Sequence, residues 1–123
     1  MGIIGPILRD HEMTTRTMPI ADPMLAEIVH RLVEAFGPEQ IYLFGSHARD
    51  KAGPDSDYDL MVVVPQAIEP GYRLAQQAHS LLWGLGVAAD ILVWTREQFD
   101  RRRHVVASLP ATIVLQGQLL YAA

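Results

Sequence analysis

Two aspartates stand directly before the most apolar strand that the sequence predicts, and they constrain the fold more than any other feature. The stretch reads Asp57-Tyr58-Asp59 and continues as Leu60–Val64, five apolar residues that favour burial in a sheet. Because side chains alternate across a strand, Asp57, Asp59 and Met61 share one face. A carboxylate at the edge of a core costs free energy unless it is paired or holds a cation. The sequence therefore predicts a carboxylate site at the start of a buried strand.

A third aspartate, Asp90, interrupts another apolar stretch, Val87–Trp94, which predicts a further strand. If the two strands lie near each other in the sheet, the carboxylates of Asp57, Asp59 and Asp90 converge on one point. Clustered carboxylates repel one another, and a divalent cation relieves that repulsion. The expected donors are all oxygens and the chain has no cysteine, so the predicted ion is Mg²⁺ or Mn²⁺.

A glycine-serine pair, Gly45-Ser46, ends a short predicted strand, Gln40–Phe44. A glycine at a strand end, followed by a helical turn, lets backbone N–H groups approach a phosphate, and the Ser46 hydroxyl adds a donor. Arg49 lies one turn further along and can reach the same anion. A phosphate-binding turn beside a carboxylate metal site is typical of phosphoryl or nucleotidyl transfer.

The remaining elements indicate an α/β or α+β domain with a small mixed sheet flanked by helices. The predicted helices are 23–36, 72–85, 96–104 and 110–115, with a helical turn at 47–51, and the predicted strands are 40–44, 57–64, 87–94 and 118–121. Residues 1–21 show no clear periodicity and are expected to form a poorly determined arm. The domain is then expected to span residues 22–123.

Composition limits the class of protein. Of the 123 residues, 50% are hydrophobic and 20% are charged, the balance of one soluble globular domain. The net charge of −4 argues against broad electrostatic binding to DNA or RNA, so direct nucleic-acid binding is not expected. No apolar stretch approaches the roughly 20 residues that span a bilayer, and no secretory signal is recognised. A cytoplasmic location is therefore expected.

The spacing of the site residues resembles that of a known superfamily. Gly45-Ser46, ten residues, then Asp57-x-Asp59 and a later Asp90 in an apolar strand are similar to the DNA-polymerase-β-like nucleotidyltransferases. More narrowly, the chain resembles the minimal nucleotidyltransferases that act as MntA-type antitoxins beside HEPN-domain ribonucleases. The resemblance runs from about residue 24 to residue 121 and includes the closing "VLQGQLLY".

The resemblance implies a polymerase-β-like palm fold and the transfer of AMP from ATP to a protein hydroxyl. The implied acceptor is a tyrosine of a cognate HEPN toxin, which the modification would silence. Asp57 and Asp59 would hold two Mg²⁺ ions, and Asp90 would hold one and help to deprotonate the acceptor. The implied triphosphate contacts are Gly45, Ser46 and Arg49.

Two alternatives remain open from the sequence. The chain could be an antitoxin that masks its toxin by contact, with an idle active site. It could also be a small-molecule nucleotidyltransferase similar to the aminoglycoside enzymes, which usually carry a second helical domain to hold the drug. The sequence leaves open which acceptor is modified and which nucleotide base is preferred. It also leaves open the oligomeric state, and with it whether the chain forms a homo-oligomer.

Two further features have more than one interpretation. Arg101–Arg103 form a basic run that favours a solvated helix face, with an acidic partner or RNA as the alternative. Trp94 falls on the same strand face as Asp90, and core packing is preferred to stacking against a base.

Overall fold

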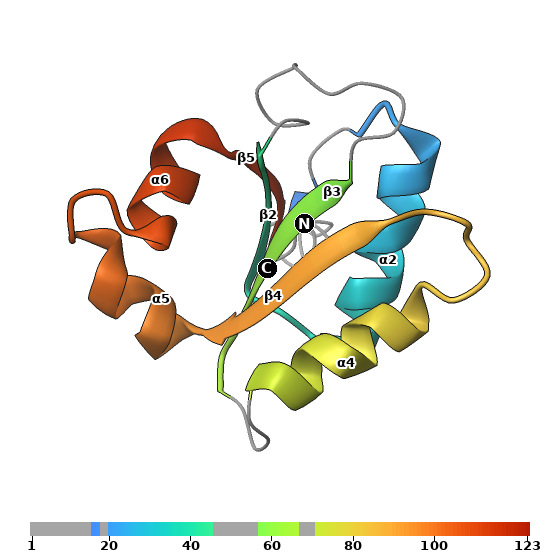
Figure 1. The fold of residues 1–123 in the computed structure, drawn as a ribbon, viewed down its shortest axis with the longest axis horizontal. Coiled ribbons are helices and arrows are strands. Elements are labelled where there is room, and N and C mark those ends of the chain that lie inside the picture. The colour runs from blue at the N-terminus through green and yellow to red at the C-terminus, as the bar shows by residue number, and fades with distance from the viewer. Residues whose placement is uncertain (1–15, 18–19, 46–56, 67–70) are drawn as a thin grey trace, which may run out of the picture.

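The computed structural model describes residues 16–17, 20–45, 57–66 and 71–123 of the chain (Figure 1). Within these residues one sheet has the strand order β1-β5-β2-β3-β4. Its strands are β1 (Arg16–Thr17), β2 (Gln40–Phe44), β3 (Tyr58–Val64), β4 (Ala89–Thr95) and β5 (Gln118–Ala122). β3 and β4 run parallel and the other neighbouring strands run antiparallel, so the sheet is mixed as expected.

Two pairs of helices cover the two faces of this sheet (Figure 1). α2 (Pro23–Phe36) and α4 (Gly71–Leu81) pack on the face to which Leu60 and Val62 of β3 point. α5 (Arg96–Arg103) and α6 (Leu109–Gln116) lie on the other face. There a second core contains Tyr42, Met61, Val63, Phe99 and Ile113. Successive side chains of β3 therefore point alternately into the two cores. Both faces of the strand are buried, which explains why its apolar run is continuous.

The ends of α2 follow from its capping residues. The Asp22 carboxylate accepts hydrogen bonds from the backbone N–H groups of Met24 and Leu25, which satisfies two donors of the first turn. At the other end Gly37 adopts the left-handed conformation with φ 54° and donates its N–H to the carbonyl of Val33. The predicted boundaries of this helix are thereby confirmed.

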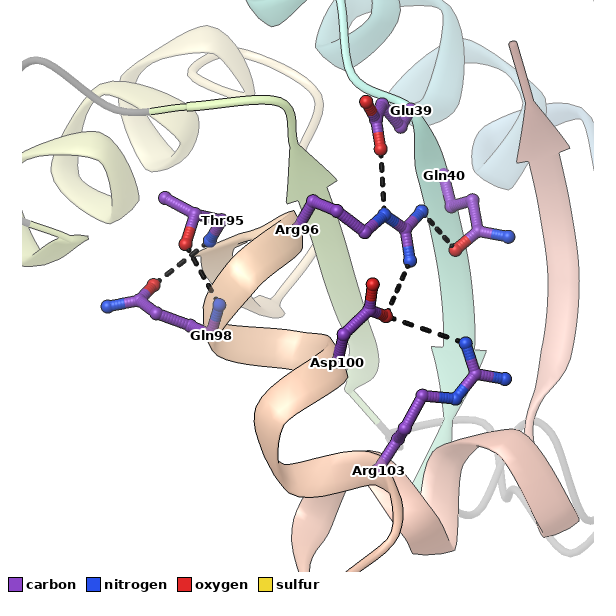
Figure 2. Close-up of polar contacts among 7 residues, drawn as sticks. All are labelled: Glu39, Gln40, Thr95, Arg96, Gln98, Asp100 and Arg103. Atoms are coloured by element: carbon purple, nitrogen blue, oxygen red, sulfur yellow. Dashed lines mark hydrogen bonds and ion pairs between the residues drawn. The ribbon is translucent and has the colours of Figure 1, made fainter.

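α5 is held at its start by a capping box and along its length by an ion-pair network (Figure 2). The Thr95 hydroxyl accepts from the Gln98 N–H at 3.1 Å, and the Gln98 side chain accepts from the Thr95 N–H at 2.9 Å. Arg96 donates to Glu39 at 2.7 Å, to Gln40 at 2.8 Å and to Asp100 at 3.0 Å. Burial alone lowers the pKa of Arg96. Its hydrogen bonds to Glu39 and Asp100 raise the pKa by more, so the net pKa lies above that of a free arginine. A charged Arg96 therefore ties α5 to β2.

The predicted order of helices and strands is confirmed, with shifts at some ends. The helix expected over 72–85 ends at Leu81, because the chain then turns through Gly84 and Gly86, which have φ values of 91° and 67°. The short strand β1 was not predicted, since two residues carry no periodic signal. The helical turn expected at 47–51 and most of the arm at 1–21 lie outside the described residues. None of the described helices is long and apolar enough to cross a membrane.

Candidate active site

The start of the parallel pair β3–β4 places two of the expected site residues side by side. Asp59 and Asp90 are register partners on these neighbouring strands. Partners in a parallel pair point to the same face, and their strands are about 4.8 Å apart. Asp59 alternates with Met61 and Val63, so both aspartates belong to the face that α5 and α6 cover further along. The two strands are thus neighbours, as convergence of the carboxylates requires.

Asp57 immediately precedes β3 and shares the face of Asp59 by alternation. Asp57 and Asp90 are exposed, whereas Asp59 is half-buried. In the part of the chain that the structure describes, no group of three or more His, Cys, Asp or Glu side chains is placed to hold a metal ion. The structure therefore places Asp59 beside Asp90, and the metal site formed by all three aspartates stays a prediction.

Gly45 follows β2 and touches the carboxylate of Asp59. The last residue of β2, Phe44, is the register partner of Asp59 in the antiparallel pair β2–β3. Gly45 has φ 75°, and a Cβ atom added to it would lie 2.2 Å from Oδ2 of Asp59. Only a glycine leaves this carboxylate in place. The expected phosphate-binding turn and the carboxylate site therefore meet at Gly45, while Ser46 and Arg49 lie outside the described residues.

Tyr58, between Asp57 and Asp59, supports the site structurally and was not predicted from the sequence. Its side chain is buried on the opposite face, and its hydroxyl donates a hydrogen bond to Oδ2 of Asp22, the N-cap of α2. Its backbone N–H donates to the carbonyl of Ala88 at 3.1 Å. Tyr58 thus fixes the start of β3 to α2 and to the segment before β4. Alternation predicts its burial, but no local signal identifies a partner 36 residues earlier.

A family of known proteins matches most of the chain. The nucleotidyltransferase domain family matches residues 25–115, which include β2, β3 and β4 and the aspartates at their ends. The chain belongs to the nucleotidyltransferase domain family. The enzyme class expected from the glycine-serine and aspartate pattern is thereby confirmed. No significant match is found among proteins of curated function.

Solved structures resemble this nucleotidyltransferase in fold. A protein from Sulfolobus solfataricus, provisionally described as a nucleotidyltransferase, is 26% identical with a TM-score of 0.52, over 63% of this chain and 69% of its own. A mutant of the toxin–antitoxin MntA-HpeT is 21% identical with a TM-score of 0.52, over 80% of this chain and 72% of its own. A toxin–antitoxin with AMP-PNP is 23% identical with a TM-score of 0.49, over 79% of this chain and 73% of its own. The mixed α/β fold is that of a polymerase-β-like nucleotidyltransferase.

The support that Tyr58 gives to the nucleotidyltransferase site can be tested through pH. Burial, together with the hydrogen bond to Asp22, raises the pKa of Tyr58 to about 12. An unfolded tyrosine loses its proton near pH 10, so the folded state binds the extra proton between about pH 10 and 12. The stabilisation is complete below that window and is lost as pH rises through it.

We expect Tyr58→Phe to lower the free energy of unfolding at neutral pH by about 1–2 kcal/mol, since the Asp22 carboxylate loses a donor. The wild type should also lose stability more steeply than Tyr58→Phe above about pH 10. Urea unfolding at a series of pH values measures both effects. Parallel pH profiles for the two proteins would show that this hydroxyl does not stabilise the start of β3.

Proposed function

We propose that this nucleotidyltransferase transfers AMP from ATP to a hydroxyl of a partner protein, and that the partner is a HEPN-type ribonuclease toxin which the modification silences. Family membership supports nucleotidyl transfer. The observation that carries the proposal is the placement of Asp59 beside Asp90, with Gly45 against the Asp59 carboxylate. The spacing of these residues resembles that of MntA-type antitoxins, and the toxin–antitoxin MntA-HpeT has a similar fold.

The donors of the site fit a hard divalent cation. Asp59 and Asp90 offer carboxylate oxygens from adjacent strands, and in the proposal Asp57, two positions before Asp59, would supply a third carboxylate. Oxygen donors without thiolates suit Mg²⁺ or Mn²⁺. When bound, such an ion would offset the negative charge of the triphosphate and make the acceptor hydroxyl more acidic.

The chain's own residues then perform the transfer. Asp90, which is exposed, accepts the proton of the acceptor hydroxyl at a carboxylate oxygen. The hydroxyl oxygen forms a bond to the α-phosphorus of ATP, and the bond from that phosphorus to the bridging oxygen of the β-phosphate breaks. Pyrophosphate leaves, and the acceptor carries AMP. Gly45, Ser46 and Arg49 would hold the triphosphate during this step through backbone N–H groups, a hydroxyl and a guanidinium.

The metal and nucleotide part of the proposal predicts the behaviour of Asp57→Asn/Asp59→Asn. Calorimetry with Mg²⁺ and ATP should show binding to the wild type and no measurable binding to the double variant, because two anionic donors become neutral amides. The replacements preserve shape, so an unchanged unfolding transition serves as the control for folding. Equal binding of Mg²⁺ and ATP by both proteins would place the nucleotide site elsewhere.

A further inference from the structure

α5 divides its charged side chains between two opposite sides. On the side toward β2, Asp100 accepts from both Arg96 and Arg103, and Arg96 also binds Glu39 (Figure 2). The negative charges of Glu39 and Asp100 on this side offset the positive charges of Arg96 and Arg103. Positions 98, 101 and 102 share the opposite side, because residues three and four apart are neighbours on a helix. Figure 2 shows Gln98 pointing away from Asp100 and Arg103.

This opposite side of α5 lines a pocket. Trp94, Gln98, Arg101 and Arg102 line a pocket of about 380 Å³ that is open to solvent on one side, a volume within the range of a ligand site. Trp94 packs against the second core and is half-buried, so its indole forms a fixed apolar wall. Gln98 adds an amide, and the two arginines add guanidinium donors. We refer to these residues as the Trp94 pocket.

The two arginines of the Trp94 pocket are available to an anion. Arg101 contacts Glu97 at 3.0 Å, but their side chains are 67% and 80% exposed, and such surface pairs are weak and easily exchanged. No ion pair of Arg102 is found among the described residues, and its side chain is exposed. The chain as a whole carries a charge of −4, whereas this side of α5 is locally basic. Its positive charge would attract an acidic partner.

The Trp94 pocket belongs to the same face of the sheet as the aspartates. Trp94 follows Asp90 by four residues along β4, so the two side chains point to the same face about 13 Å apart. An extended peptide segment of about four residues spans that distance. A partner bound in the pocket can therefore reach the aspartates with a residue close in its own sequence.

The α5–α6 hairpin also exposes apolar side chains, which favours a protein over a free nucleotide as the partner. Val105 and Val106 are 55% and 92% exposed, and Val114 and Leu115 are 40% and 82% exposed. These are four of the five large hydrophobic side chains that are exposed in the described part of the chain. Exposed aliphatic side chains bury more favourably against another protein than against a charged nucleotide, because phosphates gain no favourable contact with an aliphatic surface.

We propose that the α5–α6 hairpin docks an acidic segment of the protein acceptor, with carboxylates on Arg101 and Arg102 and an apolar side chain against Trp94. The inference rests on the proposed function for the identity of the acceptor. The separation of about 13 Å between Trp94 and Asp90 adds a sequence rule: the acceptor should carry an apolar residue about four positions from the modified hydroxyl, with acidic residues beside that apolar residue. Docking at this hairpin positions the hydroxyl at Asp90.

Tryptophan fluorescence tests the docking without any transfer reaction. The chain has two tryptophans, and Trp83, two residues after α4, is 89% exposed, so Trp83→Phe leaves Trp94 as the single reporter. The probe is a synthetic peptide with a leucine four positions from a tyrosine and three glutamates next to the leucine, compared with the same peptide carrying glutamines in place of the glutamates. We expect a saturable change in Trp94 emission with the glutamate peptide only, weakened by added salt.

Replacing the arginines should remove this response. In the Trp83→Phe background, Arg101→Ala/Arg102→Ala should weaken the binding of the glutamate peptide about tenfold, since each exposed ion pair contributes a few-fold. Arg73→Ala, at an exposed position of α4, is the matched control and should bind as before. Equal binding of the two peptides, or equal binding by the double variant, would overturn the docking proposal. A saturable change in Trp94 emission on addition of AMP that Arg101→Ala/Arg102→Ala removes would also overturn it, in favour of a nucleotide pocket.

Docking and transfer fail in distinguishable ways. Peptide binding that persists in a protein with no transfer activity supports the docking surface and counts against the proposed function. If the protein labels its acceptor, Arg101→Ala/Arg102→Ala should raise the KM for the acceptor without changing the kcat or the KM for ATP. An unchanged KM for the acceptor would overturn the docking site while leaving the proposed function in place.

Discussion

Gly45→Ala is expected to lower nucleotidyl transfer by about 100-fold or more while leaving the protein folded. A methyl group at this position would lie 2.2 Å from Oδ2 of Asp59, and the end of that side chain must move to make room. Displacement of a reacting or positioning group by about 1 Å can cost about 100-fold in rate. The left-handed backbone, with φ 75°, adds a loss of stability of about 1–2 kcal/mol. Activity should therefore fall far more than stability.

Gly37→Ala is the matched control for this variant. Gly37 also has a positive φ, 54°, but an added Cβ atom meets nothing within 4 Å. Both variants should lose about the same stability by urea unfolding, and only Gly45→Ala should lose incorporation of labelled AMP. Equal activity of Gly45→Ala and Gly37→Ala would show that contact with Gly45 does not position the Asp59 carboxylate for transfer.

The local parts of the fold could be predicted because their signals lie within a few residues. Asp22 with Pro23 marks the start of α2, and Thr95 with Gln98 marks the start of α5; the structure confirms both. The apolar run after Asp59 predicts β3 in the same way. The family resemblance added the nucleotidyltransferase class, because the chemistry depends on residue types at fixed spacing rather than on distant contacts.

The contacts between distant segments could not be predicted. The Tyr58 hydroxyl binds Asp22, and Arg96 binds Glu39, across 36 and 57 positions of the chain. Such pairs depend on how the strands are ordered, and one sequence carries no signal for them. The contact of Gly45 with the Asp59 carboxylate arises from the antiparallel register of β2 and β3. These contacts explain how the strands and side chains of the site are kept in position, which the residue types alone do not explain.

Asp90→Asn is expected to stop AMP transfer while preserving the fold and the contact with the partner. Asp90 is exposed, so the amide replaces the carboxylate without disturbing a core. The amide cannot accept the proton of the acceptor hydroxyl, and loss of a general base costs about 100- to 10,000-fold in rate. Glu34→Gln, at an exposed position of α2, is the control for removing one carboxylate and should retain activity. Pull-down of the partner and kinetics of labelled ATP together measure both properties.

Mass spectrometry of the partner after incubation with ATP and Mg²⁺ tests the central claim most directly. The protein incubated is the proposed partner, a HEPN-type toxin, and its ribonuclease activity is measured in the same samples. The proposal predicts one or more added AMP groups on a hydroxyl and loss of ribonuclease activity with the wild type, and neither change with Asp90→Asn. Full neutralisation of the toxin without added AMP would contradict the claim and identify a masking antitoxin.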